Sequence, residues 1–265
     1  MALPIAVQLY SLRDEAEKDF IGVLKRVAQI GYKAVEPAGF WNLSPQEFKK
    51  TINDLGLEMY SSHSPWARED NIPEVIETAG ILGLDKVVCG YGPAEFQDMD
   101  AIKKTAEMTN KMQEELEKNG LILFQHNHNF EFERIDGKLK YEIYAELCPK
   151  VKFQMDSFWS TNFGNEDPVE MMDLFADRII AFHLKDGLIK QEQKELKVTN
   201  GTLDREIELR ALGTGELDIP QLIKNLPQAV DSIVVELDYC NIDMFTAIEM
   251  SYKYMTENGF AEGNK

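Results

Sequence analysis

The chain has 265 residues, of which 44% are hydrophobic and 28% charged, so it is long enough to bury a large core. No stretch approaches the roughly 18 consecutive apolar residues that a membrane-spanning helix requires, which argues against a membrane protein. The formal net charge of −18 repels phosphate backbones and therefore argues against nucleic acid as a partner.

The N-terminal residues and the cysteines indicate a cytoplasmic protein. The first apolar run has no preceding basic segment and passes directly into Arg13 and Asp14, unlike a secretory signal. Cys89, Cys148 and Cys240 lie far apart in the sequence and form no CxxC pair. Neither a disulfide framework nor a zinc ribbon is therefore expected.

Short apolar segments alternate with amphipathic helical stretches along the whole chain, a pattern typical of parallel strands joined by crossover helices. Eight segments have strand character: 5–10, 34–36, 57–63, 86–90, 121–126, 151–156, 179–184 and 232–237. A closed (β/α)8 TIM barrel commonly occupies about 250 residues. The sequence therefore predicts an α/β protein with one TIM-barrel domain over residues 1–265.

Local signals mark where the helices begin and end. Ser44 and Asp167 are each followed by proline and, three residues later, by glutamate, which predicts a capped helix start at both positions. Glycines precede several predicted strands, where a residue without Cβ can end a helix in the left-handed conformation: Gly31, Gly56, Gly83 and Gly120.

One connection is unusually long, because more than 30 residues separate His183 from the helix that begins near Asp218. Within it, KELKVT and TLDREIEL flank Asn200-Gly201, a pair that favours a type I′ turn. We therefore predict a β-hairpin insertion at about 190–212, after the seventh strand. Its role is left open between a lid over the barrel mouth, an exposed hairpin and an oligomer contact.

Almost every predicted strand ends in a polar residue, and in a β/α barrel the strand ends and the loops that follow form the active site. These residues are Gln8, Glu36, His63, His126, Asp156, His183, Lys185, Glu236 and Asp238. All four histidines of the chain, including His128, lie at or just beyond these ends. Imidazoles and carboxylates from several strands suit one divalent ion such as Mn²⁺, Co²⁺, Fe²⁺, Ni²⁺ or Zn²⁺, whereas Mg²⁺ fits two imidazoles less well.

Two tryptophans follow strand ends in polar surroundings, which favours contact with a sugar ring over simple core packing. We expect Trp66 and Trp159 to stack on the apolar face of such a ring. Gln8, Glu36 and His63, which end the first three strands, are expected to bind the same substrate. The expected partner is a small, sugar-like molecule.

The motifs around these residues resemble those of the sugar phosphate isomerase and epimerase superfamily, which has the xylose isomerase-like TIM barrel. They cover nearly the whole chain: VQLYSLRD, GYKAVEPAG, QHNHNFEF, QMDSFW, HLKDG, LGTGELD and VVELD. The QHNHNFEF variant resembles the branch that includes inosose dehydratases and enzymes that cleave 3-keto-glycosides by β-elimination.

Members of this superfamily hold one divalent ion with a glutamate, an aspartate, a histidine and a second glutamate from strands five to eight. The resemblance implies three of these ligands directly: Asp156, His183 and Glu236. At the first position this chain has His126. Either His126 replaces the carboxylate as the fourth ligand, or Glu131 or Glu133 reaches back to the ion.

The resemblance implies a metal-dependent isomerase or epimerase that acts on a ketose or keto-sugar through a metal-stabilised enediolate. Glu236 retains one of the two proton-exchanging roles of the family glutamates. Glu131 resembles a second family glutamate that contacts substrate, and we assign it to substrate binding or proton transfer. His126, His128 or Lys185 would supply the opposing acid or base.

Other functions stay open. A lyase or dehydratase on a keto-inositol or 3-keto-glycoside would begin with the same step, the removal of a proton beside a carbonyl. A non-catalytic sugar-binding barrel is a third hypothesis. An abasic-site endonuclease is a fourth, but the tri-zinc sites of those related enzymes need more histidines and acids than this chain has. The family often forms dimers or tetramers, so a homo-oligomer is also open.

Overall fold

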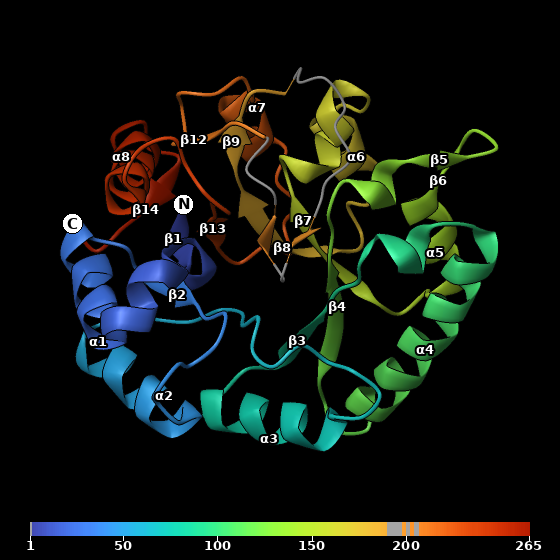
Figure 1. Cartoon of the computed structure of the whole chain (residues 1–265), viewed down its shortest axis with the longest axis horizontal. Coiled ribbons are helices and arrows are strands. Elements are labelled where there is room, and N and C mark those ends of the chain that lie inside the picture. Colours follow the sequence, from blue (N-terminus) through green and yellow to red (C-terminus); the bar gives the residue numbers. More distant parts are fainter. Residues whose placement is uncertain (1, 190–197, 200–201, 204–206) are drawn as a thin grey trace.

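Parallel strands form the centre of the molecule and helices surround them, as Figure 1 shows. The computed structural model describes residues 2–189, 198–199, 202–203 and 207–265. The strands of the barrel wall are β1 (Leu3–Gln8), β2 (Ala34–Glu36), β3 (Lys86–Cys89), β4 (Ile122–His126), β7 (Lys152–Asp156), β8 (Ile179–Leu184) and β13 (Ile233–Val235). They pair in parallel in the order β2-β1-β13-β8-β7-β4-β3. This curled parallel sheet confirms the predicted barrel.

The segment 57–63, expected to be the third strand, lies between β2 and β3 but forms only one β-bridge, between Glu58 and Ala34. Its backbone bonds to β2 are irregular, with His63 N donating to Pro37 O at 2.8 Å. On the other side, the carbonyl of Val88 in β3 accepts from Ala67 N, which lies beyond this segment. The prediction of a regular strand here is therefore wrong, although the segment fills the expected place in the wall.

The helices cover the outside of the barrel wall, and their termini follow the local signals of the sequence. They are α1 (Arg13–Ile30), α2 (Pro45–Asp54), α3 (Ile72–Leu82), α4 (Met99–Glu117), α5 (Lys140–Leu147), α6 (Pro168–Leu174), α7 (Ile219–Lys224) and α8 (Met244–Glu257). Short 3-10 helices lie at Leu9–Leu12, Pro93–Phe96, Phe130–Phe132 and Trp159–Gly164.

The two capped helix starts predicted from the sequence are present. At α2, Ser44 Oγ accepts from Glu47 N at 3.2 Å and the Glu47 carboxylate accepts from Ser44 N at 2.8 Å. At α6, the Asp167 carboxylate accepts from Val169 N and Glu170 N, at 2.8 and 3.1 Å, so the aspartate provides the cap. The four glycines expected to end helices all have positive φ: Gly31, Gly56, Gly83 and Gly120.

The interior of the barrel changes from apolar to polar along its axis. Small apolar side chains from three neighbouring strands, Ala6, Ala34 and Val234, form a separate buried cluster. Because alternate residues of a strand share a face, Gln8 and Glu36 point to the same interior two residues further along. The C-terminal end of the barrel is therefore lined by hydrogen-bonding groups, whereas the large hydrophobic cluster fills the space between strands and helices.

Asp186 organises the long connection after β8. Its carboxylate accepts from the backbone N–H groups of Gly213, Gly215 and Leu217 at 2.9–3.2 Å, which joins the HLKDG and LGTGELD motifs. Strand β9 (Asp186–Gly187) pairs antiparallel with β12 (Leu209–Arg210). The two ends of the connection are thereby held close to the barrel.

Within that connection, β10 (Val198–Thr199) pairs antiparallel with β11 (Thr202–Leu203) across positions 200–201. The turn itself and most of the predicted insertion lie outside the described residues. Two further short strands, β5 (Arg134–Ile135) and β6 (Lys138–Leu139), form a hairpin before α5, and β14 (Ala261–Glu262) pairs with the start of β1.

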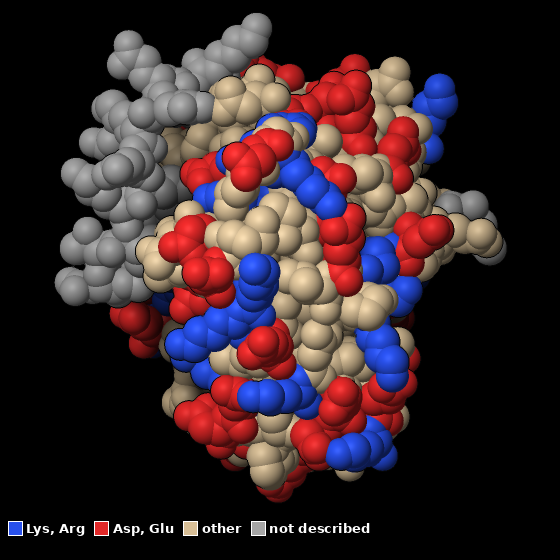
Figure 2. All heavy atoms as spheres, turned by 90° about the vertical axis from the view of Figure 1, so that its right-hand side faces the viewer, with Lys and Arg blue, Asp and Glu red and all other residues tan. Residues whose placement is uncertain are grey.

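Acidic and basic side chains are interspersed over the face shown in Figure 2, and no single acidic patch dominates it. Exposed ion pairs such as Lys118–Glu115 and Lys150–Glu117 accompany this mixed surface. No helix in the described part of the chain is long and apolar enough to cross a membrane.

Candidate active site

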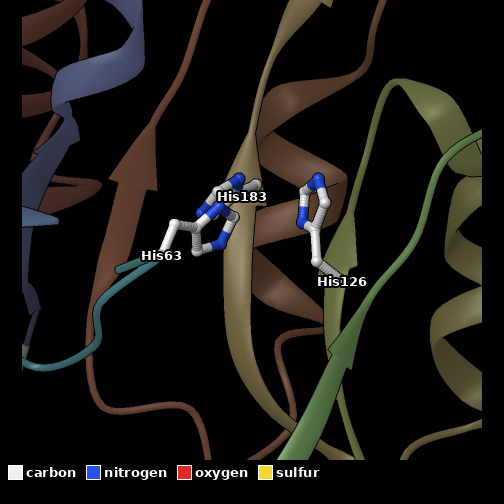
Figure 3. A group of neighbouring side chains, drawn as sticks. All are labelled: His63, His126 and His183. Atoms are coloured by element: carbon white, nitrogen blue, oxygen red, sulfur yellow. The ribbon is translucent and has the colours of Figure 1, made fainter. Parts of the chain in front are cut away.

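The barrel brings together side chains from the C-terminal ends of its strands. Figure 3 shows the rings of His63, His126 and His183 pointing toward one another, from the segment before β3, from β4 and from β8. The ring centroids lie 4.9–5.1 Å apart. Residues separated by more than one hundred positions therefore share one site.

His126, Asp156, His183 and Glu236 each offer a ligand atom within 4.8 Å of the others, and all four are buried. We call these residues the metal cluster. His63 joins two of them in an overlapping three-histidine group. The cluster contains the three ligands that the family resemblance implies and, of the candidates left open for the fourth, His126; neither Glu131 nor Glu133 belongs to either group among the described residues.

The chemistry of the cluster fits a divalent transition ion. Two imidazoles and two carboxylates match the ligands that Zn²⁺ and Mn²⁺ take in proteins. The Oδ2 atom of Asp156 is buried and has no hydrogen-bond partner among the described residues, although Lys185 Nζ lies 3.1 Å away without hydrogen-bond alignment. An unsatisfied buried carboxylate oxygen of this kind is what a cation would complete.

Burial favours the neutral form of three of the four histidines. Desolvation lowers the pKa of His63, lowers that of His126 well below its usual value, and lowers that of His128 to about 4. His183 differs: burial alone would lower its pKa, but the carboxylates of Glu36 and Glu236 outweigh this effect and raise it to about 10. A neutral imidazole can bind a metal ion, and an ion at His183 would have to displace a proton.

Lys185 is fully buried beside the metal cluster. Its Nζ atom lies 2.6 Å from Asp238 Oδ2 and 3.3 Å from Glu236 Oε2, in addition to the contact with Asp156. It also lies 4.8 Å from the centroid of the Trp159 ring. Burial alone would lower the pKa of Lys185, but the three carboxylates raise it above its usual value. The ammonium group therefore supplies positive charge within a strongly acidic site.

Glu36, expected from the sequence to bind substrate, already has partners for both carboxylate oxygens. Its Oε1 accepts from Gln8 Nε2 at 2.5 Å and lies 2.6 Å from His183 Nε2, and its Oε2 accepts from Ser61 Oγ and from Gln154 Nε2. Burial raises its pKa, yet His63 and His183 outweigh this effect and hold it at about 2. Glu36 and Gln8 lie beneath the site rather than on the wall of the pocket.

Glu131 is also enclosed. Its Oε1 accepts from Gln125 Nε2 at 3.0 Å and its Oε2 from the backbone N–H of His128 at 2.9 Å, and burial raises its pKa to about 8. These contacts place Glu131 behind the loop that carries His128. Glu133 lies further out, where its carboxylate pairs with Lys140 at 2.5 Å.

A pocket of about 450 Å³ opens above the metal cluster. Its polar wall includes His63, His126, His128, Glu236 and Asp238, and its aromatic wall consists of Tyr10, Trp66, Tyr91, Phe130 and Trp159. Both tryptophans that line the pocket, Trp66 and Trp159, are therefore those predicted from the sequence to contact substrate. Tyr91 and Phe130 were not predicted as site residues, although they follow strand ends as the tryptophans do. Asp238 was noted only for its position at the end of the eighth strand.

A second hollow of about 850 Å³ continues from this pocket and shares Trp66, Tyr91 and His128 with it. Arg68, Glu95 and Met112 lie along its other side. Trp66 therefore stands between two spaces, and its ring also contacts His63 edge-on at 5.0 Å between centroids.

Gly90→Ala is expected to displace Trp66, because a methyl group at this position would overlap the indole ring. The expected results are a shift in tryptophan emission and a loss of about 1–3 kcal/mol in the free energy of unfolding, as for other overpacking changes. Urea denaturation followed by fluorescence measures both.

Gly80→Ala is the matched control, since nothing lies within 4 Å of a Cβ at this helical glycine. It is expected to gain about 0.5–1 kcal/mol from helix propensity. Unchanged emission and stability in Gly90→Ala would show that Trp66 does not depend on this contact.

The family assignment agrees with this architecture. The family model described as xylose isomerase-like TIM barrel matches residues 24–251. The chain belongs to the xylose isomerase-like TIM barrel family. This confirms the resemblance seen in the sequence motifs. No curated protein matches the chain at a significant level.

Solved structures with the same fold include proteins of several activities. A sugar phosphate isomerase/epimerase from Parabacteroides distasonis is 22% identical with a TM-score of 0.74, over 99% of this chain and 96% of that one. A probable 3-DHS dehydratase from Bacillus anthracis is 12% identical with a TM-score of 0.74, over 96% and 99% of the two chains. The IOLI protein, solved with a zinc atom, is 16% identical with a TM-score of 0.70, over 96% and 97%. At these identities the likeness concerns the fold.

Proposed function

We propose that this protein is a divalent-metal-dependent isomerase or epimerase that acts on a ketose or keto-sugar. One observation carries the proposal: four metal-binding side chains converge at the floor of an aromatic-lined pocket at the C-terminal end of the barrel. Active sites in this fold lie at that end. The zinc-containing IOLI protein and the sugar phosphate isomerase/epimerase among the similar structures support the same reading.

In this proposal His126, Asp156, His183 and Glu236 hold one ion. When bound, the ion acts as a Lewis acid that polarises the substrate carbonyl and stabilises the negative charge formed when a neighbouring carbon loses its proton. The four side chains would hold the ion at the floor of the pocket, which His126 and Glu236 also line.

The chain's own residues move the proton. Glu236 lines the pocket, and Lys185 and His183 hold its pKa well below the usual value against the effect of burial, so it is available as a carboxylate. His128 also lines the pocket, and its Nδ1 atom has no hydrogen-bond partner among the described residues. Glu236 is therefore the proposed proton acceptor and, once protonated, returns the proton to the substrate, whereas His128, which its low pKa keeps neutral, is a hydrogen-bond partner for the substrate. Lys185 keeps Glu236 and Asp238 in place.

The pocket favours an uncharged sugar. Aromatic rings suit the apolar face of a sugar ring, and the polar residues at the floor suit its hydroxyl and carbonyl groups. No lysine or arginine is among the described residues that line it. A phosphorylated sugar would find no cationic partner among them.

Metal analysis tests the proposal. Protein purified without chelator is expected to contain about one transition ion per chain, and His126→Ala and His183→Ala are each expected to lose it. His128→Ala is the matched control, because His128 lines the same pocket but lies outside the metal cluster. Absence of bound ion in wild-type protein, even after reconstitution with Zn²⁺ or Mn²⁺, would overturn the metal-dependent mechanism.

The second hollow favours one alternative, a lyase or dehydratase on a keto-inositol or 3-keto-glycoside. It offers room beyond Trp66 for a leaving group that a free ketose does not have. Incubation with candidate keto-sugars in D₂O separates the two reactions by NMR. Deuterium in an isomeric product indicates isomerisation, whereas loss of water or of an aglycone indicates elimination.

A further inference from the structure

The side chain of Gln154 lies between one carboxylate and two histidines beneath the metal cluster. Its Oε1 atom is 2.6 Å from His63 Nε2 and 3.1 Å from His126 Nδ1, and its Nε2 atom is 2.9 Å from Glu36 Oε2. Gln154 itself is completely buried, and so is Glu36 apart from 1% of its surface. A single amide group therefore connects residues from three separate parts of the chain.

The carboxylate of Glu36 determines which way this amide points. An ionised carboxylate only accepts hydrogen bonds, so the amide atom that faces it must be the NH₂ group. The carbonyl oxygen of Gln154 then faces the two histidines and can accept one hydrogen bond from each of them. Because a carbonyl oxygen cannot donate, both facing ring nitrogens must carry a proton.

The two histidines consequently have opposite tautomers. His126 carries its proton on Nδ1, and Nε2 is left with a free lone pair. His63 carries its proton on Nε2, which also lies 3.3 Å from Glu36 Oε1, and Nδ1 is left without one. Both rings are neutral in this arrangement, which agrees with the lowered pKa values that burial causes.

Glu36 acts in the same way on His183. The Nε2 atom of His183 lies 2.6 Å from Glu36 Oε1 and its Nδ1 atom 2.8 Å from Glu236 Oε2. Glu236 belongs to the metal cluster and Glu36 does not. When an ion occupies the cluster, the remaining proton of His183 is therefore held on Nε2 by Glu36, and Nδ1 is free to bind the ion.

We propose that Glu36 and Gln154 are positioning residues that set the tautomers of His126 and His183, so that Nε2 of the first and Nδ1 of the second are the metal-binding atoms. This inference rests on the proposed metal site and deepens it. Hydrogen-bond partners of this kind orient the ligands of metal sites, and their loss typically costs about 10–100-fold in metal affinity.

Nitrogen NMR of the histidine rings tests the hydrogen-bonded layer without any metal. The chain has only four histidines, so ¹⁵N-labelled protein gives few signals, which single histidine variants assign. In metal-free protein we expect a protonated Nδ1 at His126 and a protonated Nε2 at His63. The same tautomer at both residues, or a protonated Nε2 at His126, would overturn the inference. In zinc-loaded protein His183 is expected to be protonated on Nε2.

Zinc titration calorimetry tests the consequence for metal binding. Gln154→Met is expected to weaken zinc affinity about 10–100-fold. Gln113→Met is the matched control, because Gln113 is another buried glutamine, on α4, whose Oε1 accepts from Leu123 N instead of from a histidine. It is expected to bind zinc as the wild-type protein does.

The outcomes separate this inference from the proposed function. If wild-type protein binds zinc and Gln154→Met binds it equally well, the positioning role is wrong while the metal site stands. If wild-type protein binds neither Zn²⁺ nor Mn²⁺, the proposed function fails, and the NMR tautomers of the metal-free protein still decide whether Glu36 and Gln154 set the protonation of the histidines.

Discussion

Replacing Lys185 by methionine is expected to lower the free energy of unfolding of the metal-free protein by about 3–5 kcal/mol, the usual cost of removing one partner of a buried ion pair. The ammonium group lies within 3.3 Å of carboxylate oxygens of Asp156, Glu236 and Asp238, all of them buried. Without it, like charges would face one another in a medium that screens them poorly. Urea denaturation in the presence of EDTA measures the loss.

Lys86→Met is the matched control, since Lys86 is another buried lysine on a barrel strand, but its partner Asp231 is 42% exposed. Its replacement is expected to cost less than about 1 kcal/mol. Added zinc is expected to raise the melting temperature of Lys185→Met more than that of wild-type protein, because the ion returns the missing positive charge. Equal losses in the two variants would contradict a special role for Lys185 in the acidic site.

The stability of the metal-free protein is expected to fall as the pH rises from about 6.5 to about 10, through the titration of His183. Glu36 and Glu236 overcome the effect of burial and raise the pKa of this imidazole from 6.5 to about 10. A group whose pKa is raised in the folded state contributes its full stabilisation below the unfolded pKa and loses it as the pH passes the folded pKa. The contribution of His183 is therefore complete at pH 6.5 and absent above pH 10.

The measurement is the difference in free energy of unfolding between wild-type protein and His183→Gln, with EDTA, over this pH range. Glu131, whose pKa burial raises to about 8, titrates in both proteins and largely cancels in the difference. A difference that stays constant from pH 6.5 to 10 would contradict the prediction. In acid, the free energy of unfolding changes with pH in the opposite direction because of Glu36. The pKa of Glu36 is lowered from 4.5 to about 2, so its stabilising contribution is lost as the pH falls from 4.5 to about 2.

Strand periodicity predicts that the polar residues of the metal cluster share one rim, and the family resemblance implies which of them are ligands. Asp156, His183 and Glu236 each stand at the end of an apolar run, and in a parallel barrel all such ends lie on one rim. Because alternate residues of a strand share a face, Lys185 is expected on the same face as His183. The contacts of Lys185 with Asp156 and Glu236 agree with this. His126 followed from its place in the QHNHNFEF motif.

Strand periodicity does not distinguish residues of the pocket wall from those of the layer beneath it. Gln8 and Glu36 end their strands as His63 ends its segment, yet only His63 reaches the pocket. The difference arises because Ser61, Gln154 and His183 occupy the carboxylate of Glu36 from other strands. A sequence pattern carries no information about such cross-barrel partners.

The segment 57–63 shows a second limit. The segment has the length of a strand but contains no β-branched residue. Regular strand pairing also requires backbone groups on the adjacent strand that are free to bond. Val88 in β3 accepts from Ala67 instead, and Ser61 bonds to Glu36 through its side chain. Competition from these partners leaves only the bridge at Glu58.

By itself, the sequence determined the alternation of strands and helices, the helix caps and the chemical types at the strand ends, because these depend on periodicity and on neighbours a few residues apart. Only the tertiary structure decided which polar groups meet, which of them face the pocket and which ring nitrogens are left free. Those outcomes depend on strand register and barrel closure, which place the side chains of Glu36 and His183, 147 positions apart, within hydrogen-bond distance.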